Sequence, residues 1–284
     1  MTKGNQLTLL ACQIIVPAMT TTQARDTHLK TSVGKVLKQL DAADDTVDLV
    51  VLPELSSIDY ARDTFAALSE IAEPLDGPSF QAWREVAMER NLYITYGFAR
   101  RDDQAGPYIC TAVVGPDGTL VGHYDKLHLA QYGASMEKEY FTRGDHLFVF
   151  EINGFKLAPI ICYDIRIPEL SRVLTIEHQV DVILHCGAYY RDESFHTWHP
   201  FAIVRALENQ VFLLSLNRAG DSYGGSLFCP PWQDEITHPT RFAATDEDFR
   251  VITLKHAEKH AARSQYTFLK DRLASYQLTT LRHS

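Results

Sequence analysis

Short apolar runs alternate with longer amphipathic segments through most of this chain, and few folds accommodate such a pattern. Val180–Leu184 and Val211–Leu216 are largely apolar runs of strand length, and Ser194–Asn209 between them predicts a helix. A further helix is predicted for Pro168–His178, ahead of the first of these strands. Strands that are buried on both faces and joined by helices belong to sheets covered by helices, so the pattern predicts an α/β fold.

Two hairpin signals show that the predicted sheet is mixed rather than wholly parallel. Gly115-Pro116-Asp117-Gly118 separates two apolar runs, since Pro presets a turn and Gly tolerates positive φ. Asn153-Gly154 separates two more. The other elements expected from periodicity are strands over Leu7–Val16, Val47–Leu52, Leu92–Phe98 and Val251–Leu254, and helices over Thr22–Ala43 and Pro78–Arg90.

Length and charge limit the domain organisation and the partners. The chain has 284 residues, 45% of them hydrophobic, with no internal repeat or Gly/Ser linker, so we expect a single domain over 1–284. Residues 255–284 are polar with scattered aromatics, and we expect a C-terminal extension that packs across the surface or onto a partner subunit. The net charge is −9 with no local cluster of Lys and Arg, which argues against nucleic acid as a partner.

The N-terminal run and the cysteines indicate a cytoplasmic protein without a metal. The apolar run Leu7–Val16 is shorter than a bilayer span, is interrupted by Gln13, and lacks a cleavage site downstream, so we expect a buried strand and no membrane association. The five cysteines are widely spaced without a C-x-x-C pair, which suits reduced thiols. His196 and His199 have helical spacing but no further ligand at a supportive distance, so we predict no zinc site.

Three polar residues stand where predicted strands stop: Glu54, Lys126 and Cys162. Ligands of α/β proteins bind at strand ends, so this placement is informative. A carboxylate can take the thiol proton, and an ammonium can stabilise the charge that develops on a substrate during acyl transfer. A buried Cys alone is usually an inert small hydrophobe. Here, however, Cys162 lies between a strand and a helix start at Pro168, as a nucleophile does in a sharp strand-turn-helix elbow.

Four segments in this order resemble the nitrilase superfamily of carbon–nitrogen hydrolases: VVLPEL, YDKLHL, ICYDIRIPELSR and RALENQVFLLSLNRAG. The similarity runs to about Leu254. It implies an α-β-β-α sandwich with mixed sheets, no metal and no organic cofactor. By the same resemblance Glu54 is the general base, Lys126 stabilises the tetrahedral intermediate, and Cys162 is the acylated nucleophile. Members of the superfamily look like dimers or larger assemblies, so a homodimer or higher homo-oligomer is expected.

The resemblance also implies a second glutamate between the lysine and the cysteine, which orients the substrate and the lysine. The segment LAQYGASMEKEYFTRGD offers Glu137 and Glu139. We choose Glu137, because its distance to Gly144 matches the superfamily's spacing better. An exposed loop acid is the alternative for whichever of the two is not used.

Five further residues are candidates for substrate binding, each with a plainer alternative. By resemblance the backbone N–H of Tyr163 donates to the oxyanion and Arg166 grips a substrate carboxylate, for which its planar guanidinium is suited. An ion pair of Arg166 with Glu169 or Asp164 is the alternative. His128 is expected to point to the same side of the chain as Lys126 and to shape the site. A hydrogen-bonded structural histidine is the alternative. Tyr60 and Tyr189 are expected to line or narrow the pocket, or to pack in the core.

The predicted function is therefore thiol-dependent hydrolysis of a small linear carboxamide with release of ammonia, of the ω-amidase kind if Arg166 is the anchor. An N-carbamoyl amino acid or amine hydrolase would use the same groups. A nitrilase fits less well, since C-Y-D-I-R differs from the nitrilase C-W-E pattern. A non-catalytic binding subunit is the alternative of another class. The chain departs from the superfamily at Pro230-Pro231-Trp232, an insert whose effect on the pocket rim is open.

Overall fold

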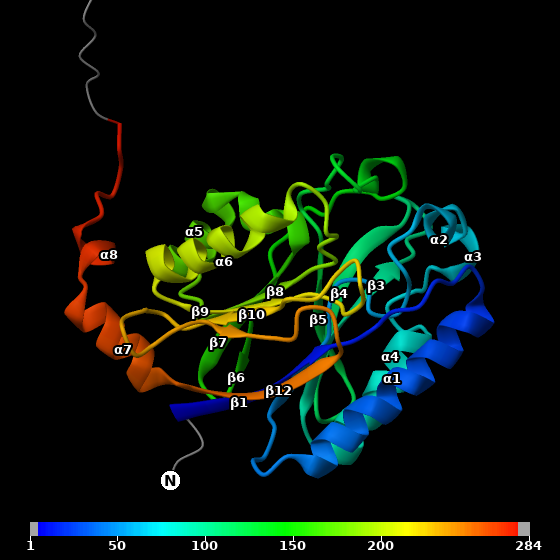
Figure 1. Cartoon of the computed structure of the whole chain (residues 1–284), viewed down its shortest axis with the longest axis horizontal. Coiled ribbons are helices and arrows are strands. Elements are labelled where there is room, and N and C mark those ends of the chain that lie inside the picture. Colours follow the sequence, from blue (N-terminus) through cyan, green and yellow to red (C-terminus); the bar gives the residue numbers. More distant parts are fainter. Residues whose placement is uncertain (1–4, 278–284) are drawn as a thin grey trace, which may run out of the picture.

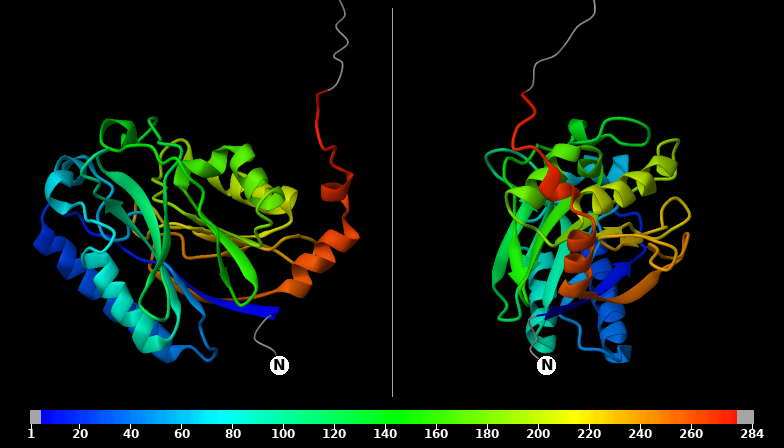
Figure 2. Two further views of the ribbon diagram at one scale, coloured as in Figure 1. Left: turned by 180° about the vertical axis from the view of Figure 1, so that it is seen from behind. Right: turned by 90° about the vertical axis from the view of Figure 1, so that its left-hand side faces the viewer.

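The computed structural model describes residues 5–277, and its centre is a pair of six-stranded sheets packed face to face. Helices cover the outer face of each sheet, so the layers run helix, sheet, sheet, helix (Figure 1). Figure 2 shows the same order from behind, with the blue and cyan helices on one flank and the yellow-green helices on the other. The predicted α/β fold with an α-β-β-α sandwich is confirmed.

The first sheet combines parallel and antiparallel neighbours. Its first three strands in the chain, β1 to β3, run parallel, whereas β12, β4 and β5 are each antiparallel to the strand beside them. In spatial order the strands are β12 (Asp248–Lys255), β1 (Gln6–Gln13), β2 (Leu49–Val51), β3 (Tyr93–Arg100), β4 (Tyr108–Val114) and β5 (Leu120–Asp125).

The second sheet has the same mixed character. Its centre is the parallel trio β7, β8 and β9, and β6, β10 and β11 are added in antiparallel fashion. In spatial order the strands are β11 (Thr240–Arg241), β10 (Leu227–Cys229), β9 (Phe212–Leu216), β8 (Val182–Cys186), β7 (Phe155–Ile161) and β6 (Phe150–Ile152).

Two helix pairs form the outer layers. α1 packs on α4 over the first sheet, and α5 packs on α6 over the second. The Thr21 hydroxyl caps α1, and proline occupies the first turn of α4 and α5, where its missing N–H leaves no hydrogen bond unmade. The helices are α1 (Thr22–Ala42), α2 (Arg62–Ala66), α3 (Leu68–Ile71), α4 (Pro78–Arg90), α5 (Pro168–Ile176), α6 (Phe195–Asn209), α7 (His256–Gln265) and α8 (Phe268–Asp271).

The apolar runs of the sequence are explained by burial on both faces of the strands. In β1, Leu7 and Leu9 point into the core between the two sheets, whereas Leu10 and Cys12 point into the core beneath the helices. Successive strand residues face opposite sides, so a strand covered on both sides has no polar face to display.

Strand direction brings the predicted site residues to one edge. Because β1, β2 and β3 are parallel and β4 is antiparallel to both of its neighbours, β5 runs in the direction of β2. The chain that leaves β2 reaches Glu54 and the chain that leaves β5 reaches Lys126 at the same end of the sheet.

The structure differs from the sequence-based expectations mainly at the periphery. The first strand ends at Gln13 rather than Val16, because the chain beyond Gln13 leaves β12 and pairs with Ala219, whose N–H donates to the Ile14 carbonyl at 2.8 Å. The short strands β10 and β11 and the helices α2, α3, α7 and α8 were not expected. The last part of the predicted extension, 278–284, lies outside the described residues, as do 1–4.

The C-terminal extension and the Pro-Pro-Trp insert contact one another. Trp232 of the insert stacks on Tyr266, which follows α7, with ring centroids 3.6 Å apart. Among residues 5–277, no helix is both long enough and apolar enough to cross a membrane.

Gly97 of β3 allows the backbone around Glu54 to pack closely against the strand. A Cβ on Gly97 would lie 2.5 Å from the Pro53 carbonyl oxygen and 2.6 Å from the Leu55 amide nitrogen, the backbone that flanks Glu54. Gly97→Ala is expected to lower the free energy of unfolding by about 1–3 kcal/mol and to impair activity, because the loop must shift. Gly34→Ala, in open space within α1, is the matched control and should stabilise by about 0.5–1 kcal/mol. Urea unfolding of both variants tests this, and a neutral Gly97→Ala would contradict it.

Candidate active site

Three charged side chains with 0% exposure meet where β2 and β5 end. The Lys126 Nζ donates to Glu54 Oε1 at 2.8 Å and to Glu137 Oε1 at 2.6 Å. One ammonium thus lies between two carboxylates in the protein interior. Such a cluster is tolerated only when its charges pair and its remaining lone pairs are hydrogen-bonded.

The second oxygen of Glu54 is held by the backbone of another loop. Ala188, which follows β8, donates its N–H to Glu54 Oε2 at 2.7 Å. On the other side, Leu55 has a φ of 46°, a left-handed conformation that turns the chain sharply after Pro53-Glu54. The carboxylate is therefore fixed by a turn and by the neighbouring sheet.

Glu137, not Glu139, is the glutamate that lies beside Lys126. It begins a short 3₁₀ turn, and its two oxygens accept the Tyr60 hydroxyl at 2.8 Å and the Ala130 N–H at 2.8 Å. Glu139 is exposed and pairs with Arg62 at 2.7 Å. Glu137 and Glu139 are thus only two residues apart, yet one carboxylate is buried and the other is solvated.

Cys162 is the first residue after β7 and adopts a left-handed conformation with a φ of 46°. That conformation costs a residue with a Cβ about 1–2 kcal/mol. The Cys162 carbonyl accepts two hydrogen bonds, from the Tyr189 hydroxyl at 2.7 Å and from His185 Nε2 at 2.9 Å. These contacts hold the strained residue, which retains 9% exposure, at the start of the turn into α5.

His185 belongs to a buried relay behind Cys162. Trp198 Nε1 donates to Ser215 Oγ at 2.7 Å, and Ser215 Oγ lies 2.7 Å from His185 Nδ1. Burial lowers the pKa of His185 to about 4, so the ring is neutral at physiological pH. The tautomer that carries its hydrogen on Nε2 satisfies the whole chain, since Nδ1 then accepts from Ser215 and Nε2 donates to Cys162.

The charges of the cluster act on the thiol. Burial and the Glu54 carboxylate raise the pKa of Cys162 well above its usual value, and Lys126 only partly opposes them. Burial also raises the pKa of Glu54 despite Lys126. Burial alone would lower the pKa of Lys126, but Glu137 and Glu54 hold it well above the usual range. The resting state therefore has a protonated thiol, a charged lysine and a carboxyl group suited to accept a proton.

Arg166 lies in the same turn as Cys162 and pairs with no carboxylate among the described residues. Its Nη1 donates to Thr197 Oγ1 at 2.9 Å, and its guanidinium lies 5.6 Å from the Tyr132 ring centroid. Its Nε and Nη2 are buried and have no hydrogen-bond partner within residues 5–277. The alternative of an ion pair with Asp164 or Glu169 is wrong, because none forms.

The other predicted binding residues have varied surroundings. Tyr163 is half-buried beside Tyr132, with ring centroids 5.5 Å apart. His128 is bonded through Nδ1 to Asp164 Oδ1 at 2.7 Å. Tyr60 and Tyr189 are buried, and their hydroxyls contact Glu137 and the Cys162 carbonyl, respectively. The structure thus assembles Glu54, Lys126, Glu137 and Tyr60 in direct contact, and ties Tyr189 to the Cys162 backbone.

Several residues that position the site were not predicted. Asp164 accepts the Ile161 N–H at 2.9 Å and the Tyr124 hydroxyl at 2.8 Å, which closes the turn at Cys162. Tyr132 reaches the site from the loop after β5, where the Arg166 guanidinium faces it. The C-Y-D-I-R segment contained the signal for Asp164, whereas no local pattern indicates Tyr132.

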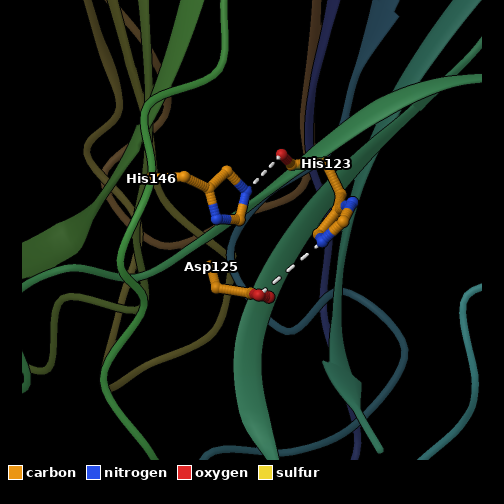
Figure 3. A group of neighbouring side chains, drawn as sticks. All are labelled: His123, Asp125 and His146. Carbon is orange, nitrogen blue, oxygen red and sulfur yellow. Dashed lines mark hydrogen bonds and ion pairs between the residues drawn. The ribbon is translucent and has the colours of Figure 1, made fainter. Parts of the chain in front are cut away.

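A separate group of potential metal ligands lies on the other side of β5. His123, Asp125 and His146 bring their ligand atoms within 4.8 Å of one another (Figure 3). However, Arg100 binds both carboxylate oxygens of Asp125, at 3.0 and 2.8 Å, and His146 Nε2 donates to the His123 carbonyl at 3.1 Å. A cation would face this guanidinium, so we assign no metal to the group. The Arg100–Asp125 pair instead anchors the end of β5 next to Lys126.

Comparison with known proteins decides the family. A model of the carbon–nitrogen hydrolase family matches residues 8–245. The chain belongs to the carbon–nitrogen hydrolase family. It is a hydrolase that acts on carbon–nitrogen bonds other than peptide bonds, and the resemblance to the nitrilase superfamily is confirmed.

Relatives of this carbon–nitrogen hydrolase include named amidases. It is 31% identical to an (R)-stereoselective amidase of Pseudomonas sp over 255 residues, 87% of this chain and 88% of the relative. It is 30% identical to the omega-amidase NIT2 of Xenopus tropicalis over 213 residues, 71% of this chain and 75% of the relative. The crystal structure of Saccharomyces cerevisiae Nit3, a member of branch 10 of the nitrilase superfamily, has a TM-score of 0.79 at 21% identity and covers 92% of this chain and 94% of its own.

Lys126→Met should destabilise this hydrolase in a pH-dependent way. The change leaves Glu54 and Glu137 buried without a cation, and we expect a loss of about 3–5 kcal/mol at about pH 7.5. Burial already raises the pKa of Glu54, and without the lysine its folded-state pKa rises further above the unfolded value, so the contribution of this carboxyl to stability is present at low pH and is lost as pH rises. The deficit should therefore shrink at about pH 5.

Urea unfolding at both pH values checks this. Lys35→Met, which breaks a surface pair with Glu247, is the control and should cost at most about 1 kcal/mol. A deficit in Lys126→Met that did not depend on pH would contradict the charge argument.

Proposed function

We propose that this hydrolase cleaves the terminal amide of a small linear substrate that carries a carboxylate, through an acyl-enzyme on Cys162. The observation that carries the proposal is the cluster in which Lys126 contacts Glu54 and Glu137 while Glu54 and Lys126 act on the thiol. The acid–base carboxyl, the cation and the thiol follow the ends of β2, β5 and β7, respectively, and they are the groups that acyl transfer requires.

The first half-reaction forms the thioester. Glu54 takes the proton from Cys162 Sγ, and the sulfur attacks the amide carbonyl carbon. The Lys126 ammonium and the Tyr163 backbone N–H stabilise the oxyanion. Glu54 then passes the proton to the amide nitrogen, the carbon–nitrogen bond breaks, and ammonia leaves.

The second half-reaction releases the acid. Glu54 takes a proton from a water molecule, whose oxygen attacks the thioester carbon. The carbon–sulfur bond breaks, and the thiolate recovers its proton from Glu54. Throughout, Glu137 holds Lys126 in place, because it shares the ammonium and is itself fixed by Tyr60 and Ala130.

Arg166 supports the substrate class. Its Nε and Nη2, at the turn that contains Cys162, have no hydrogen-bond partner in the described part of the chain, and its planar guanidinium matches a carboxylate. The relatives named omega-amidase and amidase are consistent with such a substrate. An N-carbamoyl amino acid would engage the same guanidinium, and its hydrolysis would release carbon dioxide as well as ammonia.

We also propose that the chain forms a single hydrolase domain and that it assembles into a homo-oligomer in the cytoplasm. All five cysteines are free and buried, which suits a reducing compartment. Sedimentation of the purified protein gives its mass in solution and so tests the proposed assembly.

Cys162→Ala should abolish ammonia release and leave the fold intact, since replacing a thiol by a methyl group removes little packing. Intact-protein mass after exposure to a panel of terminal amides should show an acyl adduct on the parent protein and none on the variant. Cys12→Ala, which removes another buried thiol in β1, is the control and should keep its activity. Undiminished turnover in Cys162→Ala would end the covalent proposal.

Arg166→Ala should lower kcat/KM by about 10- to 100-fold on a carboxylate-bearing terminal amide, because a charge-assisted contact is lost. A neutral amide of equal length should be affected little. Arg172→Ala, in α5 and bonded through Nη1 to the Glu208 carbonyl, is the matched control. Equal losses on both amides would remove Arg166 as the carboxylate anchor.

A further inference from the structure

A cavity of about 480 Å³ lies at the end of the second sheet that is remote from Cys162. Lys156 lines it near the start of β7, whereas Cys162 follows the last residue of the same strand. At about 3.3 Å per strand residue, about 20 Å separates the two positions. Residues of α7 and α8 line the cavity. Figure 1 shows these two helices in orange and red.

The lining of this cavity is strongly cationic. Its charged side chains are four cations and one carboxylate, namely Lys156, Lys259, Arg263, Lys270 and Asp181. The chain as a whole has a net charge of −9, so the positive charge of this cavity is opposite in sign to that of the whole chain. A concave surface with one sign of charge concentrates ions of the opposite sign.

Asp181 cannot neutralise the group. One of its oxygens pairs with Lys259, and the other accepts the backbone N–H of Lys156 at 2.8 Å. The ammonium groups of Lys156 and Lys270 have no carboxylate partner among the described residues. Burial, with the charges of Arg263 and Lys156, lowers the pKa of Lys259 to about 8.

Helix capping explains only part of this cluster. Arg263 donates to the carbonyls of Asn209 and Gln210 at 3.3 Å, where cations favourably meet the C-terminal end of α6. That role leaves Lys156 and Lys270 unexplained. His256 also lines the cavity, and its buried Nδ1 has no hydrogen-bond partner among the residues that the structure describes.

We propose that this cavity is a binding site for a small phosphate-bearing molecule. Several lysines with an arginine suit a multiply charged phosphate group, for which lysine acts as a point charge. The volume exceeds what inorganic phosphate needs and lies in the range of small-molecule sites. The ring of Tyr266, which lines the cavity and stacks on Trp232, offers a surface for the organic part.

The site can be tested with inorganic pyrophosphate on the full chain, by calorimetric titration and by fluorescence, since Trp232 reports through Tyr266. The parent protein should bind saturably, and the double variant Lys156→Gln, Lys270→Gln should bind at least about tenfold more weakly. Cys162→Ala should bind as tightly as the parent, because the two sites are distinct.

Lys30→Gln, Lys38→Gln, which removes two lysines of α1, is the matched control and should bind like the parent. Unsaturable binding by the parent, or equal weakening in the control, would overturn the proposal, since either result means charge attraction without a site. Unfolding midpoints verify that each variant is folded, and the single variant Lys270→Glu, at an exposed position of α8, provides a second route to the same result.

Discussion

The buried contact of Lys126 with Glu54 and Glu137 is the constraint on which the rest of the site depends. Moving such ions out of water costs several kcal/mol each, and attraction alone does not offset that cost. It is offset here because every remaining carboxylate oxygen has a donor, from the Ala188 and Ala130 amides and the Tyr60 hydroxyl. Two carboxylates against one ammonium leave the cluster with a formal excess of negative charge. Burial, together with these carboxylates, raises the pKa of Cys162 and favours the protonated thiol.

The nucleophile is held by a second, independent set of contacts. Cys162 is in a left-handed conformation, which is unfavourable for a residue with a side chain. Two hydrogen bonds into its carbonyl, from His185 and Tyr189, favour this conformation over the relaxed alternatives. Neutral His185 donates to Cys162 without adding a positive charge beside the thiol, so the support of the backbone does not disturb the acid–base balance set by Lys126.

The sequence predicts most of the central architecture, because strands buried on both faces leave largely apolar runs such as Val211–Leu216. It does not predict β10 and β11, which have three and two residues and too short a pattern to detect. Glu54, Lys126 and Cys162 are recognisable because each stands at a strand end. The groups that hold these residues in place are not recognisable from the sequence. The Ala188 amide is a backbone group, present in nearly every residue, and the contact of His185 with Cys162 spans 23 positions of the chain. Choosing Glu137 over Glu139 required the resemblance, and only the fold explains the choice, since one side chain turns inward and the other pairs with Arg62.

The thiol and the cationic cavity lie at opposite ends of strands β7 to β9, and the charges of one site have little effect on the other. The thiol follows the C-terminal end of β7, and the cationic cavity lies at its N-terminal end, about 20 Å away. Charges that face solvent are largely screened beyond a Debye length of about 8 Å at physiological ionic strength. The charged groups that shift the pKa of Cys162 are accordingly Glu54, Lys126 and Glu137, all of them local to the site. The lysines around the cavity can therefore gather at one end of the sheet without lowering the pKa of the nucleophile at the other.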